Sequence, residues 1–285
     1  MKIGVMVESF RAGLDGGLKA AAEVGADGVQ MYATRGETHP DAMDAAARAD
    51  LKARLADLGL ELAAVCGDFG GHGFAVAEDN PRRVADSRKV MDLAVELGCR
   101  VVTTHIGVVP DDPAHPRCAV MREACAELAR HGEKVGATFA IETGPEPAAV
   151  LRRFLDDIAV PAGLGVNFDP ANLVMVCRED IPRAVETLGP YIVHTHAKDG
   201  VNLKPVDAEA LYNSFAGVRP EGFSAHDYIS EVPLGEGGVD FPTYLPALRR
   251  AGFDGYLTIE REVGDNPRED IVKAVEFLKK LLEET

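Results

Sequence analysis

The sequence predicts an α/β barrel in which eight strands alternate with eight helices along 285 residues. Eight short segments are rich in valine, isoleucine and other apolar residues, and a segment with helical spacing follows each of them. Nearly every strand-like segment is followed directly by an ionisable residue. A doubly wound open sheet is the rival arrangement, but it usually has fewer strands, and its Gly-x-Gly-x-x-Gly pattern does not follow the first strand here.

The first half of the chain contains four strand–helix pairs. The strands are expected at residues 2–7, 28–32, 60–66 and 100–105, and the helices at 14–24, 41–58, 81–97 and 117–135. Glycines at positions 25, 59 and 98 are stop signals for the first three helices. Asn80 is expected to cap the third helix, because Pro81 then stands at its first position.

The second half keeps the same rhythm. The strands are expected at residues 138–141, 164–168, 191–196 and 255–259, and the helices at 147–157, 181–188, 241–251 and 267–282. Residues from about 200 to 240 break the pattern with glycines, prolines and scattered aromatic side chains. We expect an irregular loop there that covers the active-site face or forms an oligomer contact. Because no linker or shift in composition divides the chain, residues 1–285 are expected to form a single domain.

The composition is that of a globular protein, with 46% hydrophobic and 27% charged residues. The net charge of -16 argues against a nucleic-acid partner, which usually binds a basic face. No apolar run is long enough to cross a bilayer, and the chain enters a strand at once without a signal peptide. The five cysteines are odd in number and lack Cys-x-x-Cys spacing, so we expect free thiols and a cytoplasmic location.

Ionisable side chains at the carboxyl ends of the strands are the main functional signal, because the active site of such a barrel lies at that rim. A single charge at a strand end is usually solvated, but several that converge on one axis would repel one another unless they held a cation. The ligands we expect for one divalent metal ion are Glu142, Asp169, His196 and Glu260. Three carboxylates and one imidazole suit Mn²⁺, Mg²⁺ or Co²⁺ better than a structural zinc, because no thiolate takes part.

Five short motifs lie at these positions: Ile-Glu at 141–142, Asn-Phe-Asp-Pro at 167–170, His-Thr-His-Ala-Lys-Asp at 194–199, Pro-Leu-Gly-Glu-Gly at 233–237 and Thr-Ile-Glu at 258–260. Over essentially its whole length the sequence resembles the sugar phosphate isomerase/epimerase superfamily, whose members have a xylose isomerase-like TIM barrel. The resemblance implies a (β/α)8 barrel and a single metal bound by the same four residues, Glu142, Asp169, His196 and Glu260.

Two asparagines depart from patterns in that superfamily. Asn172 stands where ketose 3-epimerases of the free-sugar type and endonuclease IV-like members carry a histidine, and Asn202 stands where the epimerases carry an arginine. The missing histidine and the acidic charge argue against a DNA-repair activity. The His-x-His-x-Lys-Asp motif resembles instead the inosose dehydratase and sugar phosphate isomerase branches.

The expected activity is a metal-dependent isomerisation or epimerisation of a ketose or related polyhydroxy carbonyl compound through a metal-stabilised enediolate, with Glu142 and Glu260 as the acid/base pair. Mn²⁺ is the expected cofactor, with Mg²⁺ and Co²⁺ as alternatives. The substrate contacts are expected from Glu8, His72, His105, Asn172 and Lys198. Simpler interpretations stay open, namely a core histidine at 105, a surface loop at 72 and a lysine at 198 that only neutralises Asp199.

Two other functions remain open at this point. An inosose dehydratase-like lyase would need an acid for the leaving hydroxyl, for which Lys198 or His194 could serve. A non-catalytic sugar-binding barrel would keep the metal without turnover. In either case the expected partner is a small sugar or cyclitol, phosphorylated or free, with no nucleic acid and no membrane, and with a homo-oligomer as an open alternative.

Overall fold

Eight parallel strands close into a barrel in the computed structural model, which describes residues 1–158, 160–218 and 221–284. The order around the ring is β1-β10-β7-β6-β5-β4-β3-β2. The strands are β1 (Lys2–Met6), β2 (Gly28–Tyr32), β3 (Glu61–Cys66), β4 (Val101–Thr104), β5 (Thr138–Glu142), β6 (Leu164–Phe168), β7 (Ile192–Ala197) and β10 (Tyr256–Ile259). The predicted fold class is confirmed, and each predicted barrel strand agrees with the observed one to within one residue at either end.

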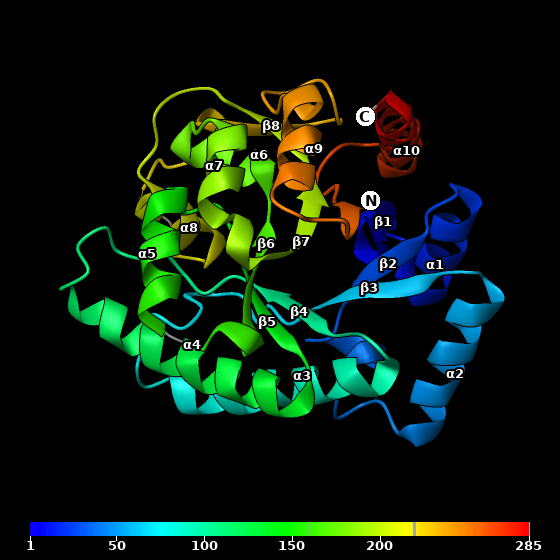
Figure 1. Cartoon of the computed structure of the whole chain (residues 1–285), viewed down its shortest axis with the longest axis horizontal. Helices are drawn as coiled ribbons and strands as arrows, with labels where there is room; N and C mark the ends of the chain where they lie inside the picture. Colours follow the sequence, from blue (N-terminus) through cyan, green and yellow to red (C-terminus); the bar gives the residue numbers. More distant parts are fainter. Residues whose placement is uncertain (159, 219–220, 285) are drawn as a thin grey trace.

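Helices surround this barrel, and α10 packs against β1 and β10, so the last helix covers the point where the ring closes (Figure 1). These helices are α1 (Gly13–Glu23), α2 (Ala45–Asp57), α3 (Asn80–Leu97), α4 (Pro116–Val135), α5 (Ala148–Ile158), α7 (Ile181–Leu188), α9 (Phe241–Arg250) and α10 (Pro267–Glu284). The shorter helical turns are η1 (Val7–Phe10), η2 (Gly36–Thr38), η3 (Pro161–Gly163), α6 (Pro170–Asn172), the π-helical η4 (Leu173–Cys177), η5 (Gly189–Tyr191) and η6 (Ala225–Asp227).

Two predicted helix starts are wrong, and the reason is local hydrogen bonding. Asn80 does not cap α3; it lies inside the first turn, and its Nδ2 donates to the carbonyl of Phe74 at 3.1 Å. The second helix begins at Ala45 and not at residue 41, because the side chain of Asp44 accepts a hydrogen bond from the Ala47 amide at 2.8 Å and so forms the cap.

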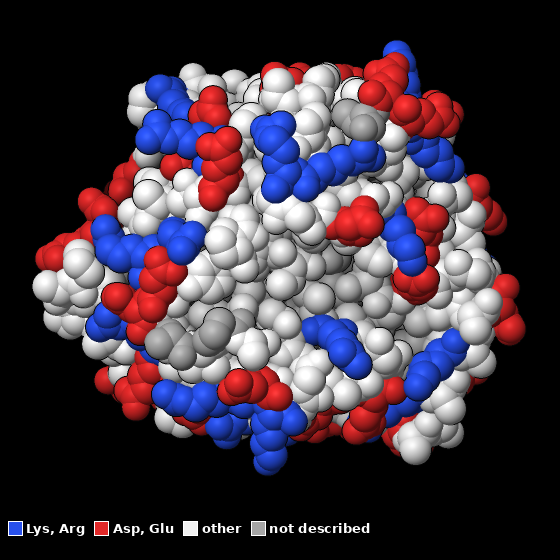
Figure 2. All heavy atoms as spheres, in the orientation of Figure 1, with Lys and Arg blue, Asp and Glu red and all other residues white. Residues whose placement is uncertain are grey.

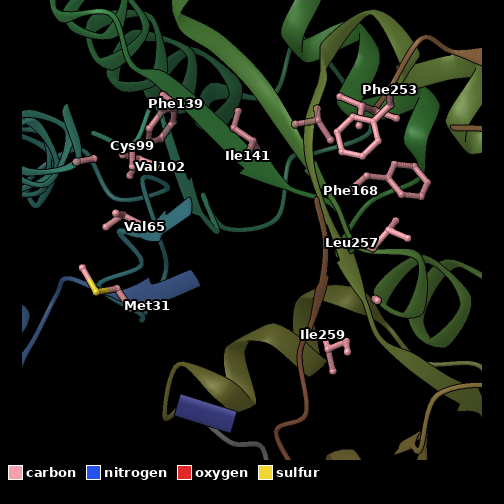
Figure 3. Packing of buried hydrophobic residues seen from close by; sticks show 14 of the residues in the cluster. Met31, Val65, Cys99, Val102, Phe139, Ile141, Phe168, Phe253, Leu257 and Ile259 are labelled. Carbon is pink, nitrogen blue, oxygen red and sulfur yellow. The ribbon is translucent and has the colours of Figure 1, made fainter. Parts of the chain in front are cut away.

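The hydrophobic core lies between the strands and the helices, as Figure 3 shows for Ile141 of β5 and Leu257 and Ile259 of β10. Successive residues of a strand point to opposite faces of the sheet. Glu142 and Glu260 each follow a core isoleucine directly, so the same alternation that buries those isoleucines under the helices turns the two carboxylates toward the barrel axis. The expected site therefore lies inside the barrel, at the carboxyl ends of the strands.

The predicted irregular loop at 200–240 is in part wrong, because regular elements fill much of it. β8 (Asp199–Asn202) and β9 (Ile229–Val232) form a small antiparallel sheet, and α8 (Ala208–Phe215) lies between them in the chain. Asp207 caps α8 by accepting from the amide of Ala210 at 2.9 Å. Strands of four residues give too short an alternation to be seen in the sequence. Residues 219 and 220 of this segment lie outside the described part of the chain.

The five cysteines are free thiols, as expected. No described helix has the length and apolar character needed to span a membrane. Figure 2 shows acidic and basic side chains interspersed around the visible face, without a large basic patch on it.

Candidate metal centre and active site

Four ionisable side chains from four neighbouring strands meet at one mouth of the barrel. Glu142 ends β5, Asp169 follows β6, His196 lies in β7 and Glu260 follows β10, and these strands are consecutive around the ring. One potential ligand atom from each residue lies within 4.8 Å of the others. All four side chains are buried. The structure therefore brings together the four residues that we expected as metal ligands.

The spacing within this cluster fits one small cation. Nδ1 of His196 lies 3.4 Å from Oδ2 of Asp169, 3.4 Å from Oε2 of Glu260 and 3.6 Å from Oε1 of Glu142. Two donors that each lie about 2.1 Å from one ion are themselves separated by about 3 to 4 Å. The donor set of three carboxylates and one imidazole is that of a hard or borderline divalent ion. The cluster could therefore bind a divalent metal.

A polar layer deeper in the barrel orients His196. Oε1 of Gln30 lies 3.3 Å from Nε2 of His196 and 2.9 Å from Nε2 of His194, which also lies 2.9 Å from the hydroxyl of Thr258. With its proton on Nε2, His196 turns the lone pair of Nδ1 toward the three carboxylates. Burial, and then the neighbouring His196, lower the pKa of His194 to about 3, so that ring stays neutral. His194 therefore has a structural position one layer below the cluster.

The carboxylates of the cluster and the neighbouring basic side chains shift one another's pKa values. Burial lowers the pKa of His196, but the carboxylates of Glu260 and Glu142 outweigh burial and hold it well above the ordinary value. Burial raises the pKa of Glu260, yet Lys198 and His196 together bring it well below its ordinary value. A divalent ion would take the place of the positive charge on His196, because the imidazole must lose its proton to become a ligand.

A cavity of about 300 Å³ opens directly onto the cluster. It is lined by Glu142 and Glu260 of the cluster and by three of the five expected substrate contacts, His105, Asn172 and Lys198. Nδ2 of Asn172 donates to Oε1 of Glu142 at 3.1 Å. A polar cavity of this size, with convergent ionisable groups at its floor, is typical of a small-molecule site.

His105 follows β4 and is held between two carboxylates. Its Nδ1 lies 3.0 Å from Oδ2 of Asp68, and its Nε2 lies 3.4 Å from Oε1 of Glu142. Burial lowers the pKa of His105, but Glu142 and the hydrogen bond with Asp68 outweigh burial and raise it to about 10. His105 is therefore cationic at neutral pH in the metal-free protein and faces the cavity.

Lys198 lies at the centre of an ionic network, and its ion-pair partners are glutamates and not Asp199. Its Nζ donates to Oε2 of Glu260 at 2.8 Å and also to Glu262, and it lies 3.9 Å from Glu231. Glu231, on β9, accepts in turn from Arg261 at 2.5 Å. Burial lowers the pKa of Lys198, but Glu260 and Glu262 outweigh burial and hold it well above its ordinary value.

Asp199 makes hydrogen bonds that connect two of the sequence motifs, the one at 194–199 and the one at 233–237. Its carboxylate accepts hydrogen bonds from four backbone amides at 2.8 to 3.0 Å, those of residues 200, 235, 237 and 239. A Cβ on Gly237 would lie 2.2 Å from Oδ1 of Asp199, so only glycine allows this approach. The His-x-His-x-Lys-Asp strand thereby fixes the Pro-Leu-Gly-Glu-Gly turn.

Glu8 and His72 are not brought to the cavity wall. Oε1 of Glu8 accepts from the amide of Tyr32 at 3.1 Å, while its buried Oε2 has no hydrogen-bond partner among the described residues. The loop of His72 instead presents Gly71 and Gly73 to the cavity. A Cβ on Gly73 would lie 2.1 Å from the backbone of Ile106, so this glycine packs tightly against the loop after β4.

Several residues of the site were not predicted. Gln30 and Asn167 belong to the inner layer; Asn167 stands two positions before Asp169 and so on the same face of its strand, a signal that could have been used. Tyr212 and Glu262 line the cavity, and Glu231 holds the network around Lys198. These three depend on the segment at 199–232 and on the loop after β10, for which the sequence carries no periodic signal.

Comparisons with known proteins agree with this architecture. The family model described as xylose isomerase-like TIM barrel matches residues 18–281. An uncharacterized protein of Methanocaldococcus jannaschii, MJ1311, is 26% identical over 208 residues, which span 69% of this chain and 61% of that protein.

Three solved structures have the same fold. A xylose isomerase domain protein from Planctomyces limnophilus superposes with a TM-score of 0.79 at 27% identity, covering 99% of this chain and 97% of the other. A D-tagatose 3-epimerase-like protein gives 0.75 at 21% identity, with 99% and 97% coverage. A xylose isomerase-like TIM barrel protein from Mycobacterium smegmatis, solved in complex with magnesium, gives 0.72 at 19% identity, with 99% and 96% coverage. The chain therefore belongs to the xylose isomerase-like TIM barrel family.

Proposed function

We propose that the protein is a divalent-metal-dependent isomerase or epimerase of a ketose or related polyhydroxy carbonyl compound. The observation that carries the proposal is the buried cluster of three carboxylates and one imidazole at the floor of a polar cavity. The D-tagatose 3-epimerase-like protein of the same fold supports this class of reaction, and the magnesium complex of the Mycobacterium smegmatis protein supports a hard divalent ion. Mn²⁺ is the ion we propose for activity, with Mg²⁺ as the alternative.

Glu142, Asp169, His196 and Glu260 would hold the ion, which when bound supplies a Lewis acid that polarises a substrate carbonyl and stabilises an enediolate. Glu142 and Glu260 line the same cavity from strands that are separated by two others around the ring. We assign them the two proton transfers: one carboxylate removes the proton beside the carbonyl, and the other returns a proton from its own side.

The neighbours of the two carboxylates suit these roles. Lys198 donates to Oε2 of Glu260 at 2.8 Å and keeps that carboxylate ionised, as a base requires. The side-chain amides of Asn167 and Asn172 donate to the two oxygens of Glu142 at 3.0 and 3.1 Å and fix its plane. His105 and Asn172 face the cavity and would bind substrate hydroxyl groups.

A lyase is the second candidate, and two cations at the cavity favour it. His105 and Lys198 have raised pKa values and are protonated at neutral pH in the metal-free protein. Either could protonate a leaving hydroxyl group in the β position, which would convert the same enolisation into a dehydration.

Deuterium exchange tests the proposal. The Mn²⁺-loaded protein is incubated in D₂O with a panel of free and phosphorylated ketoses and inososes, and proton NMR follows the carbon beside the carbonyl. We expect deuterium at that carbon in at least one compound and its epimer or isomer as product. Formation of an unsaturated ketone, seen by ultraviolet absorbance, would replace the isomerase by the lyase. No exchange with any compound would favour a non-catalytic barrel.

Glu260→Gln is the diagnostic variant, because it keeps the shape of the side chain but removes the base. We expect an unchanged circular dichroism spectrum and a loss of about 10²-fold or more in exchange rate. Glu269→Gln, at an exposed position of α10, is the matched control and should retain the wild-type rate. Wild-type exchange by Glu260→Gln would refute the proposed role.

A further inference from the structure

A second cavity of about 340 Å³ adjoins the one above the metal cluster. It lies between α8, β9 and the π-helical turn η4, which carry most of its wall. Five residues border both cavities, namely Asn172, Lys198, Tyr212, Phe215 and Glu262. The two cavities therefore adjoin and share part of their wall.

The chemistry of the two walls differs. Asp68, His105 and Glu142 give the first cavity its polar character. The second cavity has an apolar wall instead, formed by Met175, Val176, Leu211, Ile229 and Val263. Its one buried carboxylate, Glu231, is engaged by Arg261 at 2.5 Å and has little charge to offer a ligand. Most of the polar residues on its wall are those that it shares with the first cavity, namely Asn172, Lys198, Tyr212 and Glu262, while His226 and Ser230 border the second cavity alone.

An aromatic pair stands between the two cavities. The rings of Tyr212 and Phe215 on α8 meet edge to face, with centroids 5.8 Å apart. Phe215 is 61% exposed although it borders both cavities. An apolar group seated beside this ring would remove apolar surface from water on both partners.

We propose that the second cavity binds an apolar substituent of the substrate, so that the protein acts on a ketosugar or ketocyclitol that carries an aromatic or similarly bulky group. This inference rests on the proposed function for the polar half of the substrate. The occupant is chosen because the second cavity adjoins the candidate active site, shares five residues with it and adds an apolar wall that the first cavity lacks. A second copy of the chain, seated on Phe215, is the rival occupant.

Binding calorimetry with two matched probes tests the assignment. The probes are the methyl and the phenyl glycoside of 3-ketoglucose, which share the keto group and differ only in the substituent. We expect the phenyl glycoside to bind the Mn²⁺-loaded protein at least tenfold more tightly, which corresponds to about 1.4 kcal/mol. The same preference is expected without metal, because the second cavity contains none of the four proposed metal ligands.

Ala225→Trp fills the second cavity from η6 and should abolish the preference for the phenyl glycoside. Ala49→Trp, on the exposed face of α2, is the matched control and should retain the wild-type ratio. Equal affinities in the wild type, no detectable binding of either probe, or a preference that survives Ala225→Trp would overturn the inference. So would a dimer in sedimentation that Ala225→Trp converts to a monomer.

Deuterium exchange separates this inference from the function on which it rests. If the phenyl preference is present but neither glycoside nor any other ketose exchanges, the proposed enolisation fails and the assignment of the cavity stands. If ketoses exchange but the two glycosides bind equally, the proposed function stands and the assignment of the cavity fails.

Discussion

The burial of Glu146 predicts that the protein loses stability as the pH rises from mildly acidic to mildly alkaline values. This residue precedes α5 and is only 3% exposed. Its Oε2 accepts from the amide of Val109 at 3.0 Å, while Oε1 has no hydrogen-bond partner among the described residues. Burial raises the pKa of Glu146 from 4.5 to about 8, against the smaller effects of that hydrogen bond and of His105.

The sign and size of the effect follow from this pKa. The unfolded chain ionises Glu146 near pH 4.5, whereas the folded protein keeps it protonated up to about pH 8. The protonated Glu146 side chain therefore makes its full contribution to the free energy of unfolding below pH 4.5. This contribution falls as the pH rises and is lost once the pH passes 8. Each pH unit within this window is worth about 1.4 kcal/mol, so the limit is about 5 kcal/mol. Local relaxation lowers this, and we expect about 2 to 4 kcal/mol.

The assay is urea unfolding at pH 5.5 and pH 8.0, followed by circular dichroism, for the wild type and Glu146→Gln. The glutamine imitates the protonated carboxyl group at every pH, so the variant should gain about 2 to 3 kcal/mol relative to the wild type between the two pH values. Glu269→Gln, on the surface of α10, is the control and should follow the wild type. Parallel pH profiles for the wild type and Glu146→Gln would show that the buried carboxyl group is not kept protonated and would refute the reasoning.

Three further predictions concern the cluster and the turn beside it. Mn²⁺ at about 100 times its dissociation constant should raise the melting temperature by about 5 °C in the wild type and not in Asp169→Asn, and an equal rise in both would remove Asp169 from the ligand set. The affinity for Mn²⁺ should fall by up to about tenfold per unit decrease in pH, because His196 must release a proton to bind the ion and the neighbouring carboxylates have raised its pKa. Calorimetry at pH 6, 7 and 8 measures this affinity, and one constant value would contradict the prediction. Asp199→Ala should lower the free energy of unfolding by about 3 kcal/mol, because four backbone amides lose their acceptor. Asp265→Ala, at an exposed position, is the control and should leave urea unfolding unchanged. Equal unfolding curves for the two variants would show that the turn at 233–237 does not need the carboxylate.

The position of the four-residue cluster could be predicted because strand periodicity constrains its members twice. A residue such as Glu142 or Glu260 must follow a run of core residues, and its parity relative to Ile141 or Ile259 decides that it faces the axis. Closure of the barrel then brings the strand ends together whatever their separation in the sequence. The same parity places His194 one layer below His196, where it meets Gln30.

Side-chain directions in loops cannot be predicted from periodicity, and there the sequence offered less guidance about which residues line the cavity. His72 was expected at the substrate because it lies in a glycine-rich loop, but the cavity is lined by the neighbouring glycines Gly71 and Gly73 and not by His72. Glu146 has the sequence context of a solvated loop residue, and only the approach of Val109 reveals that it is buried. Neither fact follows from local propensity, because both depend on contacts between separate connections.

The two proposals assign chemistry and selectivity to different parts of this chain. The strand ends supply the cluster, and hydrogen bonds along eight strands hold those ends in place, so the proposed reaction depends on the most regular part of the fold. The second cavity takes more than half of its lining from the segment at 199–232, which includes the aromatic pair of α8 and residues of β9. Substitutions at Tyr212 or Phe215 should accordingly change which substrate is bound while the metal affinity stays the same, since neither residue belongs to the four-residue cluster. A change in metal affinity on replacing Phe215 by alanine would show that the segment also shapes the cluster, and the division between the two parts would not hold.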